Sequence, residues 1–198
     1  SDTMMVANYD PNTYKINIMS IPRDTKVTID GRNRKINFAY PHGGIDLAVD
    51  TVSELLDIDI KYYVFLDTTA FREIIDILDG VELYIPPGMD YDDPIQKLHI
   101  HLESGMQVLD GKKAEQFVRF RQPNSWRRAP AELKKYYDGS DLKRIEAQQR
   151  FLKALIDQKL NIQNLPKLNP IIEVVFENIE TNYTTNDLLK LSGAVSKL

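Results

Sequence analysis

Residues 62–85, YYVFLDTTAFREIIDILDGVELYI, decide the fold class of this chain. Residues 62–66 are rich in aromatic and branched side chains, which predicts a buried strand. Residues 68–78 form a helical pattern that places four apolar side chains on one side, namely Phe71, Ile74, Ile75 and Leu78. Residues 81–85 return to a strand pattern. Strand, helix and strand in succession indicate an α/β domain with helices layered on a sheet.

The flanking sequence continues this alternation. Residues 3–8 and 14–21 read as two strands around the turn Asp10-Pro11-Asn12, which predicts a hairpin. A helix is expected after Gly43-Gly44, over residues 45–56, and a strand over residues 98–102. From Lys112 onward the pattern is mostly helical, and residues 122–139 form the one long irregular stretch.

Length and composition suit one globular domain. The 198 residues are 42% hydrophobic and 27% charged, and no apolar run reaches the roughly 20 residues that cross a bilayer. No signal peptide opens the chain, and Ser1 leads directly into strand-like sequence. We therefore expect a piece of a longer protein. The absence of cysteine excludes disulfides and thiolate metal sites.

The charge is unevenly distributed. A net charge of −4 argues against general nucleic-acid binding. Residues 112–150 nevertheless carry 11 Lys or Arg against 5 Asp or Glu, a net +6, while the remainder carries 14 against 24, a net −10. This basic island indicates an anion site, and a solvated helix surface is the alternative.

The common hydrolase motifs are missing. The chain has no nucleophile elbow, no GxxxxGK phosphate loop and no HExxH. His99 and His101 alternate along a predicted strand, so they share one face, as two metal ligands do. No third ligand is evident from the sequence, and we interpret them as a surface pair.

Arginine is the remaining candidate for binding chemistry, and it occurs in three separate segments. Arg23 follows Pro22 at the end of a strand, where α/β sheets place ligands. Arg119 and Arg121 share a face only if the chain is extended there. Several guanidinium groups together can hold a pyrophosphate, although a single arginine is more often a surface salt-bridge partner.

The third arginine segment lies on a predicted helix. Asp141 precedes Arg144 by three residues and Gln148 follows it by four, so the three side chains share a face. A neighbouring stripe of the same helix is expected to face the core, and it consists of Ile145, Leu152 and Ile156.

Six motifs, in order along the chain, resemble the LytR-CpsA-Psr family. They are Ser1-Asp2-Thr3; Ser20-Ile21-Pro22-Arg23-Asp24-Thr25; Lys35-Ile36-Asn37 with Ala39-Tyr40 and Gly43-Gly44; Leu109-Asp110-Gly111; Val118-Arg119-Phe120-Arg121; and Asp141 through Arg144 to Gln148-Gln149. Such a set in order is far more specific than any one motif.

The resemblance implies a single extracellular domain over residues 1–198, a three-layer α/β/α sandwich with a central mixed sheet. It implies an enzyme that transfers a glycopolymer, such as teichoic acid or capsule, from undecaprenyl pyrophosphate to a muramic acid hydroxyl of peptidoglycan. The expected cofactor is Mg²⁺. The expected location is the outer face of the cytoplasmic membrane or the cell wall of a Gram-positive bacterium, with the membrane reached through an N-terminal helix.

The resemblance also implies residue roles. Asp2 matches the aspartate that contacts the metal. The implied phosphate-binding residues are Arg23, Lys35, Arg119, Arg121, Arg144 and Gln148, and the implied catalytic set is Asp2, Arg23, Arg121 and Arg144. Asp24 and Asp141 match positions that suit a base or a residue supporting the site from behind.

The segment 122–139 leaves two interpretations open. The segment 122–139 carries Trp126 and Tyr137, which we expect either to overhang the site and stack on sugar or to form a surface insertion without ligand contact. Ser140 stands where the family commonly has glycine.

The alternative functions are a pyrophosphatase acting on the same lipid and a non-catalytic polyprenyl-lipid-binding module.

Overall fold

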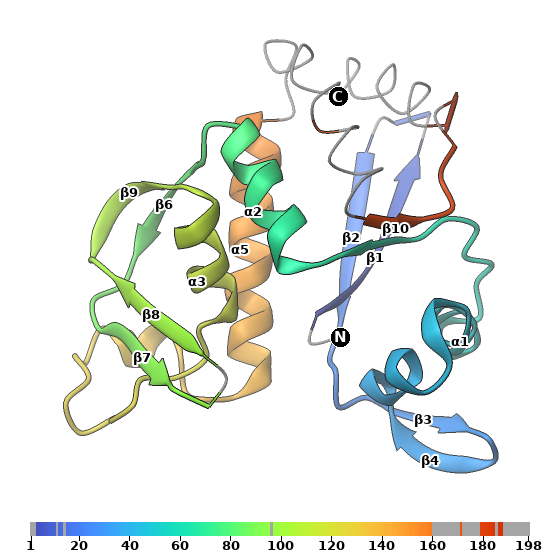
Figure 1. The fold of residues 1–198 in the computed structure, drawn as a ribbon, viewed down its shortest axis with the longest axis horizontal. Coiled ribbons are helices and arrows are strands. Elements are labelled where there is room, and N and C mark those ends of the chain that lie inside the picture. The colour runs from blue at the N-terminus through green and yellow to red at the C-terminus, as the bar shows by residue number, and fades with distance from the viewer. Residues whose placement is uncertain are drawn as a thin grey trace. The chain divides into compact units, whose positions relative to one another are not determined.

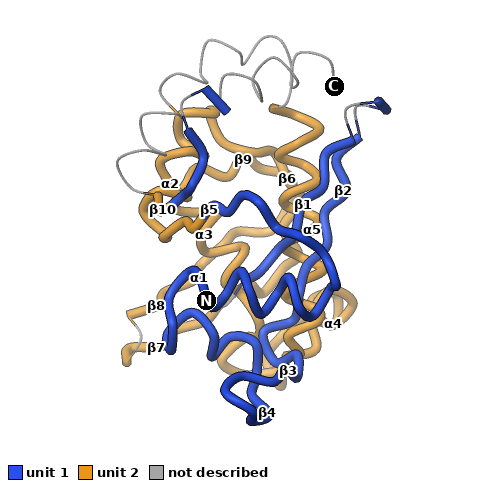
Figure 2. The backbone as a smooth tube through the Cα atoms, turned by 90° about the vertical axis from the view of Figure 1, so that its right-hand side faces the viewer, with its two compact units in different colours: residues 1–64, 181–187 blue, residues 65–180, 188–198 orange. Residues whose placement is uncertain are grey.

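The structure is a computed structural model that describes residues 3–10, 12–13, 15–95, 97–159, 171, 179–184 and 186–187. It divides into two compact units (Figure 2), residues 1–64 with 181–187 (unit 1) and residues 65–180 with 188–198 (unit 2). Each unit has a separate hydrophobic core. None of the described helices combines the length and the apolar character that crossing a membrane requires.

Unit 1 begins with the predicted hairpin. Strands β1 (Met4–Asp10) and β2 (Lys15–Ile21) are antiparallel, with Met4 opposite Ile21. The Asp10 side chain accepts hydrogen bonds from Asn12 N at 2.9 Å and Thr13 Oγ1 at 2.8 Å, which fixes the turn. A second antiparallel hairpin, β3 (Lys26–Ile29) with β4 (Arg32–Lys35), was not predicted, because the sequence of β4 is entirely polar.

A helix follows this second hairpin. The short 3-10 helix η1 (Ile36–Phe38) leads into α1 (Ala39–Leu56), which is interrupted at Gly43 and Gly44. Gly44 has φ +71, a left-handed conformation that favours glycine. The helix therefore starts before the glycine pair and kinks there, rather than starting after it. The core of unit 1 comprises Ile21, Val27, Ile29, Ile36, Ala39 and Val52.

The predicted buried strand at 62–66 is wrong in two respects. Strand β5 (Val64–Leu66) has only three residues, and Val64 and Leu66 are 51% and 42% exposed. Within the described residues, β5 pairs only with β10 (Ile179–Thr181) in a two-stranded sheet, so little covers its side chains. Beside it, Thr181 Oγ1 donates a hydrogen bond to Tyr63 O at 2.6 Å.

Unit 2 combines helices with two antiparallel strand pairs (Figure 1). Helix α2 (Thr68–Ile77) is capped by Asp67, whose carboxylate accepts from Thr69 N and Ala70 N. Strand β6 (Val81–Ile85) pairs with β9 (Gly105–Leu109), and β7 (Met89–Asp93) pairs with β8 (Leu98–Leu102). The predicted bounds of β6 and β8 are confirmed.

The described part of unit 2 also contains the helices α3 (Gly111–Arg119), α4 (Leu133–Tyr136) and α5 (Asp141–Lys159). The buried residues of α5 are Arg144, Ala147, Gln148 and Phe151. The expectation that Ile145, Leu152 and Ile156 face the core is therefore wrong, since these side chains are only half-buried. Apolar spacing misled here because the buried stripe itself contains two polar residues.

Candidate functional site

In unit 2, the candidate residues gather where α3 ends and α5 begins. The buried Gln148 side chain donates from Nε2 to the Val118 carbonyl at 2.9 Å, which ties α5 to the last turn of α3. Arg121 Nε donates to the Gly139 carbonyl at 2.5 Å, so the chain just before α5 is held against the chain just after α3. Two hydrogen bonds thus join motifs that lie far apart in the sequence.

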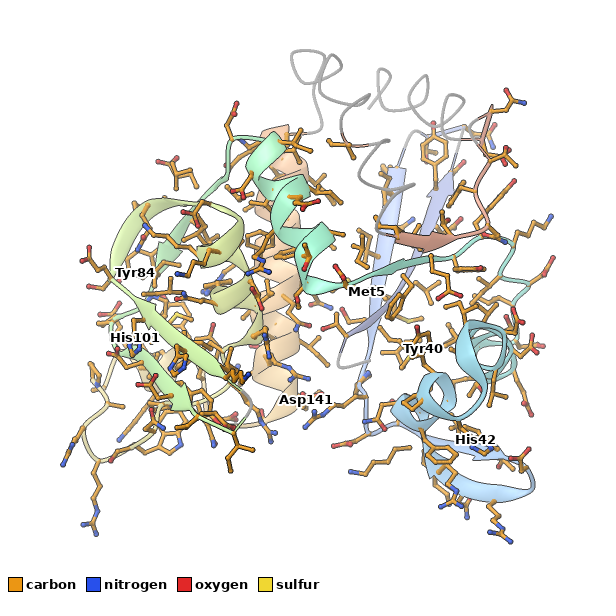
Figure 3. The ribbon with its side chains drawn as sticks, viewed as in Figure 1. Met5, Tyr40, His42, Tyr84, His101 and Asp141 are labelled. Atoms are coloured by element: carbon orange, nitrogen blue, oxygen red, sulfur yellow. The ribbon has the colours of Figure 1, made fainter. Side chains whose placement is uncertain are left out.

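Asp141 and Arg144 form a buried ion pair at the start of α5, where Figure 3 labels Asp141. Arg144 Nη2 lies 2.6 Å from Asp141 Oδ1, and the two side chains are only 9% and 14% exposed. The predicted shared face of Asp141, Arg144 and Gln148 is confirmed. Because burying a charge is costly, such a pair persists only where its geometry is good, and it orients the guanidinium group.

The residue before α5 acts as its cap. Ser140 Oγ accepts a hydrogen bond from Lys143 N at 3.3 Å, and Ser140 N donates to Asp138 Oδ1 at 2.8 Å. Hydrogen bonds from the Ser140 side chain and backbone lower the pKa of Asp138 below its ordinary value. Ser140 therefore fixes the start of the helix that carries Arg144.

Arg119 and Arg121 differ in their surroundings. Arg119 ends α3 and donates from Nη1 to Glu115 Oε1 at 2.7 Å, one helical turn back. The buried Phe120 has extended backbone angles, φ −63 and ψ 132, so the chain turns out of the helix between the two arginines. Arg119 and Arg121 share a face only where the chain is extended, and here the chain becomes extended only after Arg119.

In unit 1, the structure brings together the turn after β2 and the end of β4. Asn37 N donates to Arg23 O at 3.2 Å, and Lys35 Nζ lies 2.7 Å from Asp24 Oδ1. The Arg23 and Lys35 motifs, predicted separately, therefore form one local cluster. Asp2, the predicted metal ligand, lies outside the described residues.

The structure thus assembles two groups of predicted residues, one in each unit. Unit 1 holds Arg23, Asp24 and Lys35, and unit 2 holds Arg119, Arg121, Asp141, Arg144 and Gln148. Convergence of the two groups on one pyrophosphate stays a prediction.

The predicted sugar-stacking role of Tyr137 is wrong. Tyr137 is fully buried in the core of unit 2 and packs edge-on against Phe120, with ring centroids 4.9 Å apart. Burial raises the pKa of its hydroxyl. Trp126 also packs, partly buried, against this core. The segment 122–139 contains helix α4 and contributes core residues, because its aromatic side chains point inward.

Sequence reasoning did not single out Arg150. Its guanidinium carbon lies 5.3 Å from the ring centre of Phe117 and 4.9 Å from that of Tyr136. Arg150 also lines a small cavity of about 180 Å³ together with Lys135, Tyr136, Glu146 and Ala147. The net charge of the 112–150 island was the signal for such a residue, but charge alone could not choose among its eleven cations.

Comparison with known sequences gives close relatives over the whole chain. TagV of Bacillus subtilis, a polyisoprenyl-teichoic acid–peptidoglycan teichoic acid transferase, is 32% identical over 206 residues, covering 100% of this chain and 49% of TagV. TagT of Bacillus subtilis, which has the same description, is 29% identical over 205 residues, covering 100% of this chain and 58% of TagT. The chain therefore spans about half the length of these curated relatives.

Solved structures of similar proteins match the fold of this chain. The crystal structure of Bacillus subtilis TagV matches with a TM-score of 0.76 at 30% identity, covering 100% of this chain and 72% of that chain. A structure of TagT bound to LI-WTA matches with a TM-score of 0.72 at 27% identity, covering 100% and 69%. This likeness confirms the predicted α/β fold class. The family model described as the LytR_cpsA_psr family matches residues 1–197. The chain belongs to the LytR-CpsA-Psr family.

Proposed function

We propose that the chain is the catalytic domain of a phosphotransferase that moves a glycopolymer from polyprenyl pyrophosphate to peptidoglycan. The observation that carries this proposal is the buried Arg144, which Asp141 orients and which lies at the start of the helix joined through Gln148 to the end of α3. Teichoic acid transfer by TagV and TagT supports the choice of substrates.

The proposed reaction needs positioning and charge stabilisation from the protein. The acceptor hydroxyl oxygen attacks the phosphorus that carries the glycopolymer. The bond from that phosphorus to the bridging oxygen breaks, polyprenyl phosphate leaves, and the hydroxyl proton is released. Arg121 and Arg144 bind the phosphate oxygens and stabilise the negative charge that develops on the leaving group.

The two described carboxylates of the site already contact cations. Asp141 lies against Arg144, and Asp24 lies against Lys35. We therefore assign both carboxylates to orienting those side chains, not to holding a metal. Mg²⁺ prefers oxygen ligands, so our proposal of Mg²⁺ as cofactor depends on Asp2.

The same proposal includes the surroundings of the enzyme. We place the domain on the outer face of the cytoplasmic membrane of a Gram-positive bacterium, held there by an anchor in the longer protein. The partners are the lipid-linked donor and the peptidoglycan acceptor, with no nucleic acid. A location at the cell wall suits relatives that are peptidoglycan teichoic acid transferases of Bacillus subtilis.

The test is to incubate the whole extracellular part with lipid-linked donor, Mg²⁺ and peptidoglycan. Polymer attached to peptidoglycan supports transfer. Released phosphate without attachment favours the pyrophosphatase, and donor binding without turnover favours the lipid-binding module. Arg121→Ala is expected to reduce kcat by about 10²–10³, the loss that other enzymes show when one hydrogen-bond donor to the charge of the transition state is removed. The matched control is Lys153→Ala, an exposed cation on α5, which should transfer normally.

A further inference from the structure

The outer face of the β7–β8 hairpin carries four side chains of the types that bind metals. Asp90 lies opposite His101 and Asp92 lies opposite His99 in the antiparallel register, and all four are exposed. Figure 3 labels His101 on this hairpin. The alternate residues on the other face, Met89, Ile100 and Leu102, are buried in the core of unit 2. The four polar side chains therefore stand on a rigid support.

Three of these side chains converge on one point. Asp92 Oδ1 lies 2.6 Å from His99 Nδ1 and 3.2 Å from His101 Nε2, and one ligand atom from each residue lies within 4.8 Å of the other two. The predicted common face of the two histidines is confirmed. The third ligand that the sequence did not reveal comes from the neighbouring strand.

We propose that Asp92 Oδ1, His99 Nδ1 and His101 Nε2 bind a transition-metal dication of the Zn²⁺ class. Bonds of about 2.1 Å in a tetrahedron place ligand atoms about 3.4 Å apart, so the two contacts of Asp92 need to open by less than about 1 Å. The two histidine nitrogens lie within 4.8 Å of each other and need to close by at most about 1.4 Å. The fourth position faces solvent and is filled by water. None of these ligands is Asp2, the residue to which we assign Mg²⁺.

A fourth residue completes the arrangement. His101 Nδ1 lies 3.0 Å from Asp90 Oδ1, on the opposite edge of the ring from Nε2. A carboxylate that accepts a hydrogen bond from the other ring nitrogen holds a metal-binding histidine in the correct tautomer and orientation. Asp90 is therefore a positioning residue for His101.

The ligand types select the metal. Mg²⁺ and Ca²⁺ prefer oxygen ligands, whereas imidazole nitrogen suits Zn²⁺ and its neighbours. A site with two histidines, one carboxylate and an open position therefore disfavours Mg²⁺ and Ca²⁺. An exposed pair of His–Asp hydrogen bonds is the competing interpretation, and it predicts no metal selectivity.

The metal site also touches the segment 122–139. Asp92 N donates to Asn124 Oδ1 at 2.7 Å, and Asn124 Nδ2 donates to Asp92 O at 2.9 Å. Asn124 lies three residues after Arg121. A bound metal that fixes Asp92 therefore also stiffens the strand to which the start of this segment is attached.

The experiment titrates the whole extracellular protein with Zn²⁺ against a fluorescent chelator. We expect one Zn²⁺ per chain that excess Mg²⁺ does not displace. His99→Gln and His101→Gln should each weaken Zn²⁺ binding at least 100-fold, and Asp90→Asn should weaken it about 10–100-fold. Circular dichroism without metal checks that each variant folds, and a variant that fails is replaced by Asp92→Asn.

The third histidine is the matched control. His42 lies 2.9 Å from Asp30, and within the described residues this pair belongs to no cluster of three ligand types. His42→Gln should leave Zn²⁺ binding unchanged. The proposal is overturned if Zn²⁺ does not bind below about 100 μM, if folded variants of His99 and His101 bind normally, or if His42→Gln loses as much affinity as they do.

Discussion

Replacing Asp141 by alanine removes the carboxylate that lies 2.6 Å from Arg144 Nη2. At an effective dielectric constant of about 20, two unit charges at that distance attract by roughly 6 kcal/mol, and the desolvation of both groups opposes this. Removing one partner of a buried pair typically costs about 3–5 kcal/mol, and losing an acidic residue from a helix N-terminus adds about 0.3–1 kcal/mol. We therefore expect Asp141→Ala to lower the free energy of unfolding by about 3–6 kcal/mol.

The assay is urea unfolding followed by tryptophan fluorescence. Trp126 is the single tryptophan and packs against the core of unit 2, so its emission reports on the unit that contains the pair. Arg144→Met provides the second arm of a double-mutant cycle. In that background Asp141→Ala should cost only the helix-terminus contribution, because the buried guanidinium charge of Arg144, which the substitution would otherwise leave uncompensated, is gone.

A second pair on the same helix gives the control. Lys153 and Asp157 lie 2.8 Å apart, but their side chains are 77% and 57% exposed. Asp157→Ala should change the free energy of unfolding by no more than about 0.5 kcal/mol. If Asp141→Ala has an equally small effect, or costs the same with and without Arg144, the reasoning from burial is refuted.

Three further predictions concern the approach to α5. Gly139→Ala should destabilise by about 1 kcal/mol in the same urea assay, because φ is +85 and a Cβ would lie 3.1 Å from Gln122 Oε1; an unchanged midpoint contradicts this. Tyr137→Phe should be neutral or stabilising, since the buried hydroxyl has no hydrogen-bond partner among the described residues, whereas Tyr137→Ala should cost about 3–5 kcal/mol. The lowered pKa of Asp138 means that its ionised form, bound by Ser140, stabilises the fold above about pH 4, and this contribution is lost as pH falls through the folded-state pKa. Asp138→Asn should therefore be less stable than the parent at pH 7 and equally stable near pH 2, and a constant difference across this range argues against the shift.

Local spacing in the sequence determined much of the fold and part of the site. The strands at 81–85 and 98–102, the first hairpin and helix α2 follow from periodicity and turn residues. The common face of Asp141, Arg144 and Gln148 follows from the helical repeat alone. The order of six motifs was sufficient for the family. Each of these elements, and each motif taken singly, depends on residues close together in the chain, which is why a single sequence carries them.

Contacts between distant residues were decided only by the tertiary structure. Periodicity could not show that β5 stays exposed, or that the buried stripe of α5 contains Arg144 and Gln148. An aromatic residue in an irregular segment suggested ligand stacking, yet Tyr137 fills the core. Asp92 joins His99 and His101 only because the β7–β8 register places it there. Which side chains are buried, and which ones meet, depends on which helices and strands pack together. The free energy of that packing is shared among residues that lie far apart in the sequence, so their spacing along the chain does not predict it.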